Sequence, residues 1–155
     1  MSDSYIRLIP GDREWQPGPE AAAAAAAYVE GLFSDSADHV EYVEYEFYDR
    51  VTLIDAGENT SRITCSRCEG DIDTGWFFDI AEEHDEQFDS LDVTVPCCAA
   101  VVALDTLRYD WPVGFARFEV SAMNATRAKY ELDAQELAVV ADILGHPVRQ
   151  ILAHY

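Results

Sequence analysis

The sequence predicts an α+β protein: an antiparallel sheet with helices packed on one face and a zinc-ribbon-like insert. Three observations support this class: segments of alternating apolar and polar residues, helical segments near both ends, and two cysteine pairs that bracket an acidic stretch. The order is strand, helix, two strands, insert, two strands and a helix, which is typical of helices segregated to one face of a sheet. A chain of 155 residues suits one domain, expected to span 1–155 with the insert at about 62–100.

The first third of the chain alternates between strand and helix patterns. Residues 5–9 alternate and predict a short strand. Pro19 suits the first position of a helix, which we expect to run through the alanine tract to about Phe33. From residue 41 to 48 apolar and acidic residues alternate, which predicts a half-buried strand with an acidic outer face. Its inward residues would be Val43, Tyr45 and Phe47.

The rest of the chain contains a second helix, several strands and a clearly marked third helix. Residues 76–88 have apolar side chains at helical spacing, and strands are predicted at 91–95, 99–104 and 115–121. The third helix begins at Asp133, with Glu136 completing a capping box, and ends at Gly145. Residues 148–155 favour another short helix, with a strand as the alternative.

Four cysteines form the strongest functional signal. Cys65 and Cys68 form a C-x2-C pair, and Cys97 and Cys98 are adjacent. Four thiolates suit tetrahedral zinc and leave no open coordination position, so such a site is structural, although iron accepts the same ligands. Successive side chains of a strand point in opposite directions, so both members of the second pair reach one ion only if the backbone turns there. His84 is the fallback ligand if one of them does not reach it.

Two other interpretations of the cysteines stay open. A redox dithiol is disfavoured, because the segment after Cys68 is acidic and turn-like, which raises a thiol pKa rather than lowering it. Buried free thiols are the other alternative. No leader-like apolar segment occurs in residues 1–15 and no apolar run is long enough to span a membrane, so we expect a cytoplasmic protein, in a compartment that favours metal ligands over disulfides.

The net charge indicates the kind of partner. The chain has 30 acidic and 10 basic residues, a formal charge of −20, which opposes binding to nucleic acid or to anionic membrane. From Glu69 to Thr106 there are eleven acidic residues and no Lys or Arg. We expect this segment to dock a basic protein through Glu82, Glu83 and Glu86. Immunity proteins and antitoxins have such a charge profile, and the comparison rests on charge alone.

No catalytic or nucleotide-binding motif is present, so we predict a non-enzymatic protein with no catalytic residue. Two alternatives remain. One is an enzyme with a structural zinc and a site near Trp111 and His146, and the other is a structural subunit of a larger assembly. The aromatic loop at 109–115 is expected to plug the core rather than bind a ligand.

Three segments together resemble a family of uncharacterised actinobacterial proteins with a zinc-ribbon-like module. They are the cysteine module C-S-R-C with P-C-C, the run D-W-P-V-G-F-A-R-F at 110–118, and G-H-P-V-R-Q at 145–150. The resemblance covers most of the chain. It implies metal binding and no particular activity.

Overall fold

A computed structural model describes residues 3–57 and 59–155, and its centre is a five-stranded sheet. The strands of this sheet are β1 (Ser4–Pro10), β2 (Tyr42–Ile54), β5 (Gln87–Phe88), β9 (Gly114–Met123) and β10 (Val148–His154). They lie in the order β10-β1-β9-β2-β5, and every neighbouring pair is antiparallel. The predicted α+β class with an antiparallel sheet is confirmed.

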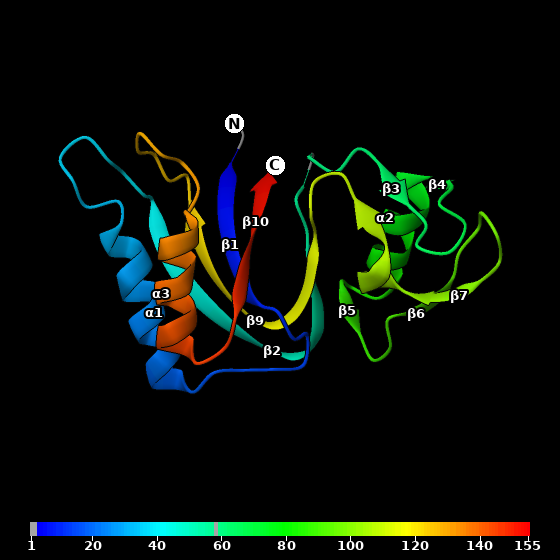
Figure 1. The fold of residues 1–155 in the computed structure, drawn as a ribbon, viewed down its shortest axis with the longest axis horizontal. Coiled ribbons are helices and arrows are strands. Elements are labelled where there is room, and N and C mark those ends of the chain that lie inside the picture. The colour runs from blue at the N-terminus through cyan, green and yellow to red at the C-terminus, as the bar shows by residue number, and fades with distance from the viewer. Residues whose placement is uncertain (1–2, 58) are drawn as a thin grey trace.

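Two helices cover one face of this sheet. The helices α1 (Pro19–Gly31) and α3 (Ala134–Leu144) lie side by side on that face (Figure 1). Strand, helix and strand thus occur twice, as β1-α1-β2 and β9-α3-β10, and the four strands interleave in the order of the ferredoxin-like split βαβ motif. The insert leaves this frame after β2 and returns at β9.

The alanine tract allows α1 to lie close to the sheet. Ala22 and Ala25 are fully buried, and they pack in one cluster with Phe118 and Val120 of β9. An alanine has no side chain beyond Cβ, so the helix backbone approaches the sheet closely while large residues on β9 fill the space. The alternating residues Ala116, Phe118 and Val120 of β9 are completely buried.

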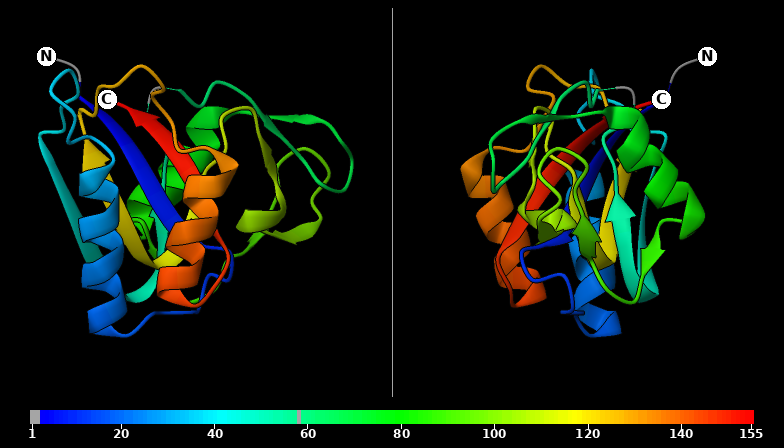
Figure 2. Two further views of the ribbon diagram at one scale, coloured as in Figure 1. Left: turned by 60° about the vertical axis from the view of Figure 1, so that its left-hand side comes forward. Right: turned by 90° about the vertical axis from the view of Figure 1, so that its right-hand side faces the viewer.

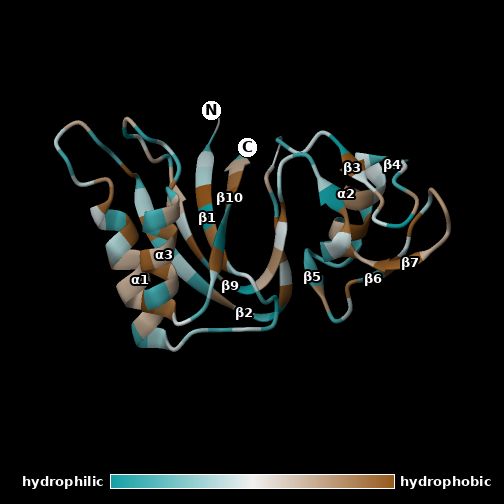
Figure 3. Cartoon of the chain, viewed as in Figure 1, coloured by the Kyte–Doolittle hydropathy of each residue, from teal (hydrophilic) through white to brown (hydrophobic). Residues whose placement is uncertain are grey.

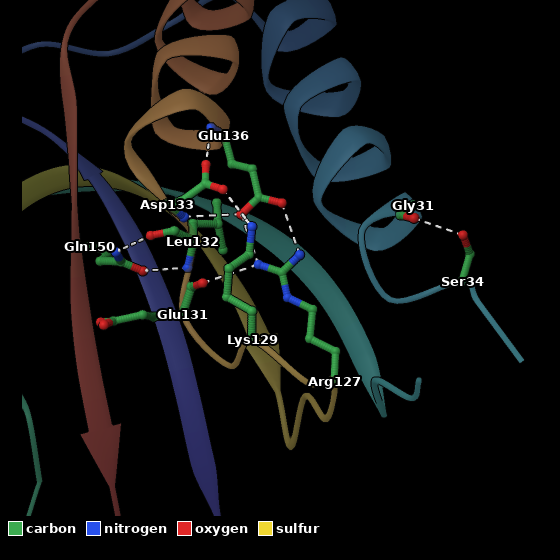
Figure 4. Close-up of polar contacts among 9 residues, drawn as sticks. All are labelled: Gly31, Ser34, Arg127, Lys129, Glu131, Leu132, Asp133, Glu136 and Gln150. Atoms are coloured by element: carbon green, nitrogen blue, oxygen red, sulfur yellow. Dashed lines mark hydrogen bonds and ion pairs between the residues drawn. The ribbon is translucent and has the colours of Figure 1, made fainter. Parts of the chain in front are cut away.

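The start of α3 is fixed by the predicted capping box (Figure 4). The Asp133 carboxylate accepts the Glu136 N–H at 2.8 Å, and the Glu136 carboxylate accepts the Asp133 N–H at 3.0 Å. Arg127 also donates to both oxygens of Glu136, each at 2.8 Å. The helix ends at Gly145, whose φ of +88° is the left-handed conformation expected of a C-terminal glycine.

The bonds of Glu136 at the start of α3 predict that the protein loses stability in acid. Hydrogen bonds from Arg127 lower the pKa of Glu136 to about 2. The folded pKa therefore lies below the ordinary value of about 4.3, so the stabilisation is complete above that value and is lost as pH falls towards 2. Glu136→Gln is expected to reduce the free energy of unfolding at pH 7 by about 1–2 kcal/mol, and by progressively less from pH 5 to pH 2. Urea unfolding across pH measures this, with Asp142→Asn on the same helix as the control; equal effects of both changes at every pH would contradict it.

The C-terminal segment corrects a prediction. Residues 148–154 form strand β10 rather than the favoured short helix, and they pair with β1 along its whole length, from Ser4 opposite His154 to Pro10 opposite Val148. This pairing buries Ile151 and Ala153. The helical spacing of the apolar residues is a local preference, and the long-range pairing with β1 outweighs it.

The insert consists of short elements on the side of the sheet away from α1 and α3 (Figure 2). They are β3 (Ile63–Thr64), β4 (Asp71–Ile72), α2 (Thr74–Glu83), β6 (Asp92–Thr94), β7 (Val101–Ala103), a 3-10 turn (Leu104–Thr106) and β8 (Arg108–Tyr109). Strands β4, β3 and β8 form one small sheet, and β6 and β7 form a two-stranded ribbon. That the insert and the sheet form one domain over 1–155 stays a prediction.

Two predictions within the insert were partly wrong. The helix α2 ends at Glu83, and Phe88 lies in strand β5 instead of extending the helical face. The segment 99–104 was expected to be a buried strand, but its strand β7, in the two-stranded ribbon, is buried on one side only: Val102 is 7% exposed and Val101 is 63% exposed. Figure 3 shows this ribbon as hydrophobic, so apolar sequence alone did not distinguish it from a core strand.

A second core joins the insert to the sheet. It contains Leu53 and Phe115 of the sheet together with Ile63, Phe77 and Leu104 of the insert, all buried. Tyr109 packs against Phe77 with ring centroids 5.3 Å apart, so the start of the aromatic loop does plug the core, whereas Trp111 is 41% exposed. In the described ranges, no helix is long and apolar enough to cross a membrane.

Candidate metal centre

Two tight turns bring the four thiols together. Cys65 and Cys68 lie in the turn between β3 and β4, and Cys97 and Cys98 lie in the turn between β6 and β7. All four Sγ atoms lie within 4.8 Å of one another, with Cys68 and Cys97 at 3.3 Å and Cys65 and Cys98 at 4.0 Å. The two cysteine pairs, 29 or more residues apart in sequence, therefore form one cluster.

The two turns have the same backbone hydrogen bonds. In the first, the Cys65 N–H donates to the Gly70 carbonyl at 2.9 Å, and the Glu69 N–H donates to the Cys65 carbonyl at 3.1 Å. In the second, Val95 and Ala100 make the first of these bonds at 3.0 Å, and Ala99 and Val95 make the second at 3.0 Å. The fifth residue of each turn is left-handed, with φ of +60° at Glu69 and +61° at Ala99.

This equivalence shows how the second turn departs from the first. Residues 64–70 correspond to residues 94–100, so Cys98 takes the place of Cys68, but buried Val95 takes the place of Cys65. Cys97 stands where the first turn has Arg67. The backbone turns over residues 96–98, so the adjacent thiols both reach the cluster, as the sequence required for a shared ion.

Backbone N–H groups favour the thiolate form in the first turn. The Cys65 sulfur accepts the Arg67 N–H at 3.3 Å, and the Cys68 sulfur accepts the Gly70 N–H at 3.3 Å. The backbone N–H groups of Cys68 and Arg67 lower the pKa of the Cys65 thiol to about 6. Burial of the sulfur and hydrogen bonds with neighbouring thiols raise the pKa of Cys97 to about 12. The N–H groups of the first turn therefore stabilise negative charge on its two sulfurs, as binding of a cation requires.

The donor set fits a tetrahedral metal ion. A Zn–S distance of about 2.3 Å places the sulfurs of a tetrathiolate site about 3.8 Å apart, and the two short separations here lie on either side of that value. Small rotations of the side chains would complete the tetrahedron. The cluster is thus a possible metal site, and thiolate chemistry admits both zinc and iron.

The fallback ligand lies outside this cluster. His84 is exposed at the end of α2, and its ring packs against Phe88 with centroids 5.0 Å apart. The cluster of four thiols does not include it. The other aromatic candidates are elsewhere: His146 stacks on Trp15 at 4.6 Å, and Trp111 is exposed in the loop that precedes β9.

Comparisons with known proteins give no relative for this fold and cluster. No protein family, curated protein or solved structure matches the chain. The resemblance to an actinobacterial family is therefore unsupported.

The equivalence of the two turns was not predicted, although the sequence contains a pattern that indicates it. Aligning T-C-S-R-C-E-G at 64–70 with T-V-P-C-C-A-A at 94–100 matches the threonines and the second cysteines. Cysteine spacing alone does not reveal this match, because Val95 occupies the first ligand position of the second turn.

The equivalence of the two turns predicts that a cysteine ligand of the second turn can be moved from position 97 to position 95. Cys97→Ala alone is expected to weaken zinc binding by more than the roughly 10–100-fold typical of changes to groups that only support a ligand. Adding Val95→Cys should restore one zinc per chain, because Val95 occupies the place of Cys65. Elemental analysis and competition with a chromophoric chelator measure both. If the double variant binds no better than Cys97→Ala, the two turns do not present ligands equivalently.

Proposed function

We propose that the four cysteines hold a structural zinc ion and that the chain is a non-enzymatic protein whose insert binds a basic protein partner. The convergence of two distant thiol pairs supports the metal. The outer face of α2 supports the partner. On this proposal the ion connects the two turns of the insert and keeps α2 in a fixed position.

The outer face of α2 combines an apolar centre with an acidic rim. Phe78 is 39% exposed and contributes to a shallow hollow of about 360 Å³ with Glu82, Asp85 and Glu86. Glu83 is exposed at the end of the same helix, next to Glu82 in the chain but outside the hollow. Protein interfaces commonly bury an apolar or aromatic centre inside a polar rim, and we call these five residues the acidic α2 face.

Its charges are not neutralised by the chain. Four other acids of the insert pair with arginines from outside the acidic segment, in the pairs Glu69–Arg108, Asp71–Arg62, Asp89–Arg50 and Asp105–Arg13. In the described part of the chain, none of the four acids on the acidic α2 face has an ion pair. Partial burial and the nearby Asp55 raise the pKa of Glu86, and a partner's cation there would oppose that shift.

A one-signed surface of this kind acts mainly on the rate of association. It attracts a basic partner over roughly one Debye length, about 8 Å at physiological ionic strength, and disfavours acidic partners and nucleic acid. A small protein that blocks a basic toxin would use the same complementarity, and this is the support for an immunity-like or antitoxin-like role.

Charge reversal on the acidic α2 face tests the proposal. A partner is first isolated from native lysate, and it has to be basic and stoichiometric. Reversing Glu82, Glu83 and Glu86 to Lys should then slow association about tenfold or more and flatten its salt dependence, with little change in zinc content or melting temperature. Surface plasmon resonance across a salt series measures the rate.

The matched control reverses three exposed acids of the N-terminal region, Glu14, Glu20 and Glu30, which gives the same net charge. This control should slow association much less. If both triple variants slow it equally, total charge rather than the acidic α2 face attracts the partner. If neither does, the face is only a solvated surface.

A further inference from the structure

A second hollow lies on the face of the main sheet opposite α1 and α3. Ile6 and Leu8 of β1 pack under the helices, so the alternating residues Tyr5 and Arg7 face the other side. The insert packs against one end of that side, where Ile9, Leu53 and Phe115 are buried with it. The other end remains open as a hollow of about 390 Å³, within the range of small-molecule sites.

Four tyrosines line this hollow: Tyr5, Tyr42, Tyr48 and Tyr155. Tyr5 and Tyr155 meet edge to face with ring centroids 5.8 Å apart. Tyr42 is 40% exposed. The faces of aromatic rings are negative and attract cations, alkylammonium groups among them.

Arg7, the one cationic side chain among the described residues of the lining, is already neutralised. Arg7 donates from Nε and Nη2 to the two oxygens of Glu119 at 2.8 and 2.9 Å, and from Nη1 to the Tyr155 hydroxyl at 3.1 Å and the Asp55 carbonyl at 3.4 Å. The Tyr48 hydroxyl also donates to Glu119. This network occupies the guanidinium, so Arg7 is not free to bind an anion.

The remaining charges of the lining are negative. Asp3, Glu44, Glu46 and the uncharged Ser121 complete the lining, and no further Lys or Arg contributes to it among the described residues. These carboxylates do not lie close enough together to hold a metal ion. Among the described residues, only the four cysteines form a group that could do so. A divalent metal ion needs several oxygens at short range, so the geometry favours a larger cation that contacts rings and carboxylates together.

We propose that this hollow binds a primary alkylammonium group, either that of a free diamine or polyamine or that of a lysine side chain. The ammonium would lie near Glu44 and Glu46, and the alkyl chain would lie against the tyrosine rings. The hollow shares no lining residue with the acidic α2 face or with the cysteine cluster, so its test is separate from that of the proposed function.

Isothermal titration of the whole protein with 1,5-diaminopentane and with Nα-acetyl-lysine methylamide, at physiological ionic strength, tests the proposal. Saturable binding of one ligand per chain is expected. Tyr42→Leu and Glu44→Gln should each weaken it about fivefold, which corresponds to about 1 kcal/mol. Tyr45→Leu is the matched control, because Tyr45 is 41% exposed on the same strand but lies outside the hollow, beside Phe47, whose ring contacts Phe118. Glu20→Gln is the control for charge.

The two ligands distinguish the source of the ammonium group. Tighter binding of the diamine assigns the hollow to free polyamines, and tighter binding of the blocked lysine assigns it to a side chain of a protein partner. The proposal is overturned if neither ligand saturates, if Tyr45→Leu weakens binding as much as Tyr42→Leu, or if Mg²⁺ at equal concentration displaces the ligand completely, which would indicate general charge attraction.

Discussion

Cys68→Ser is expected to abolish stoichiometric zinc binding and to disorder the insert, including the edge strand β5, while strands β10, β1, β9 and β2 stay folded. The turns that carry the cysteines join strands of only two or three residues, and such short hairpins are marginal alone. Ligand binding stabilises the folded state by about 4 kcal/mol when the free metal exceeds its Kd 1,000-fold. Loss of the ion should therefore lower the free energy of unfolding of the insert by about that much or more.

No described residue of the insert lies in the core under α1 and α3, which is why the loss should be confined. Near-ultraviolet circular dichroism, fluorescence of half-buried Trp76 in α2, and amide exchange would separate the two regions. The control is Ser66→Ala, in the same turn and exposed. If Cys68→Ser retains zinc and melts like Ser66→Ala, the cysteines do not form a structural centre.

Arg7→Leu is expected to destabilise the protein by about 3–5 kcal/mol, because it leaves the Glu119 carboxylate buried without its partner. The two side chains are only 16% and 7% exposed and form a bidentate pair. Adding Glu119→Leu should recover much of the loss, since a buried ion pair contributes little more than an apolar pair of similar volume.

Urea unfolding measures the cost, and the chain offers a matched control. Arg13 pairs with Asp105 in a setting where the side chains are 42% and 29% exposed. Arg13→Leu should cost less than about 1 kcal/mol, because water solvates the remaining charge. Equal losses for Arg7→Leu and Arg13→Leu would show that burial of the pair does not matter.

The sequence predicted the elements whose signals are local. The capping box of Asp133 and Glu136 and the left-handed Gly145 depend on neighbouring residues, and both are present. The alternating strands at 5–9 and 115–121 also fall within β1 and β9. In each case short-range hydrogen bonding or the two-residue period of a strand decides the structure.

Elements decided by distant partners were harder to predict. The segment at 148–154 becomes a strand because β1 offers a full-length partner, and that partner lies about 140 residues earlier in the chain. The interleaved strand order is also set by packing rather than by any local pattern. In the same way, the tyrosine-lined hollow arises only when β1, β2, β9 and the C-terminal residue come together.

The cysteine cluster was predictable because metal binding restricts residue type and spacing. That both Cys97 and Cys98 would reach it depended on a turn at Pro96, and the structure contains that turn. The replacement of a ligand by Val95 in the second turn required the backbone hydrogen bonds to be seen.

X-ray absorption at the zinc edge, on protein purified under reducing conditions, tests the central proposal most directly. One zinc per chain surrounded by four sulfurs at about 2.3 Å is the expected result. Three sulfurs and one nitrogen around the zinc would indicate that a histidine takes the place of one cysteine as a ligand. Protein that is folded, reduced and free of any metal would contradict the account.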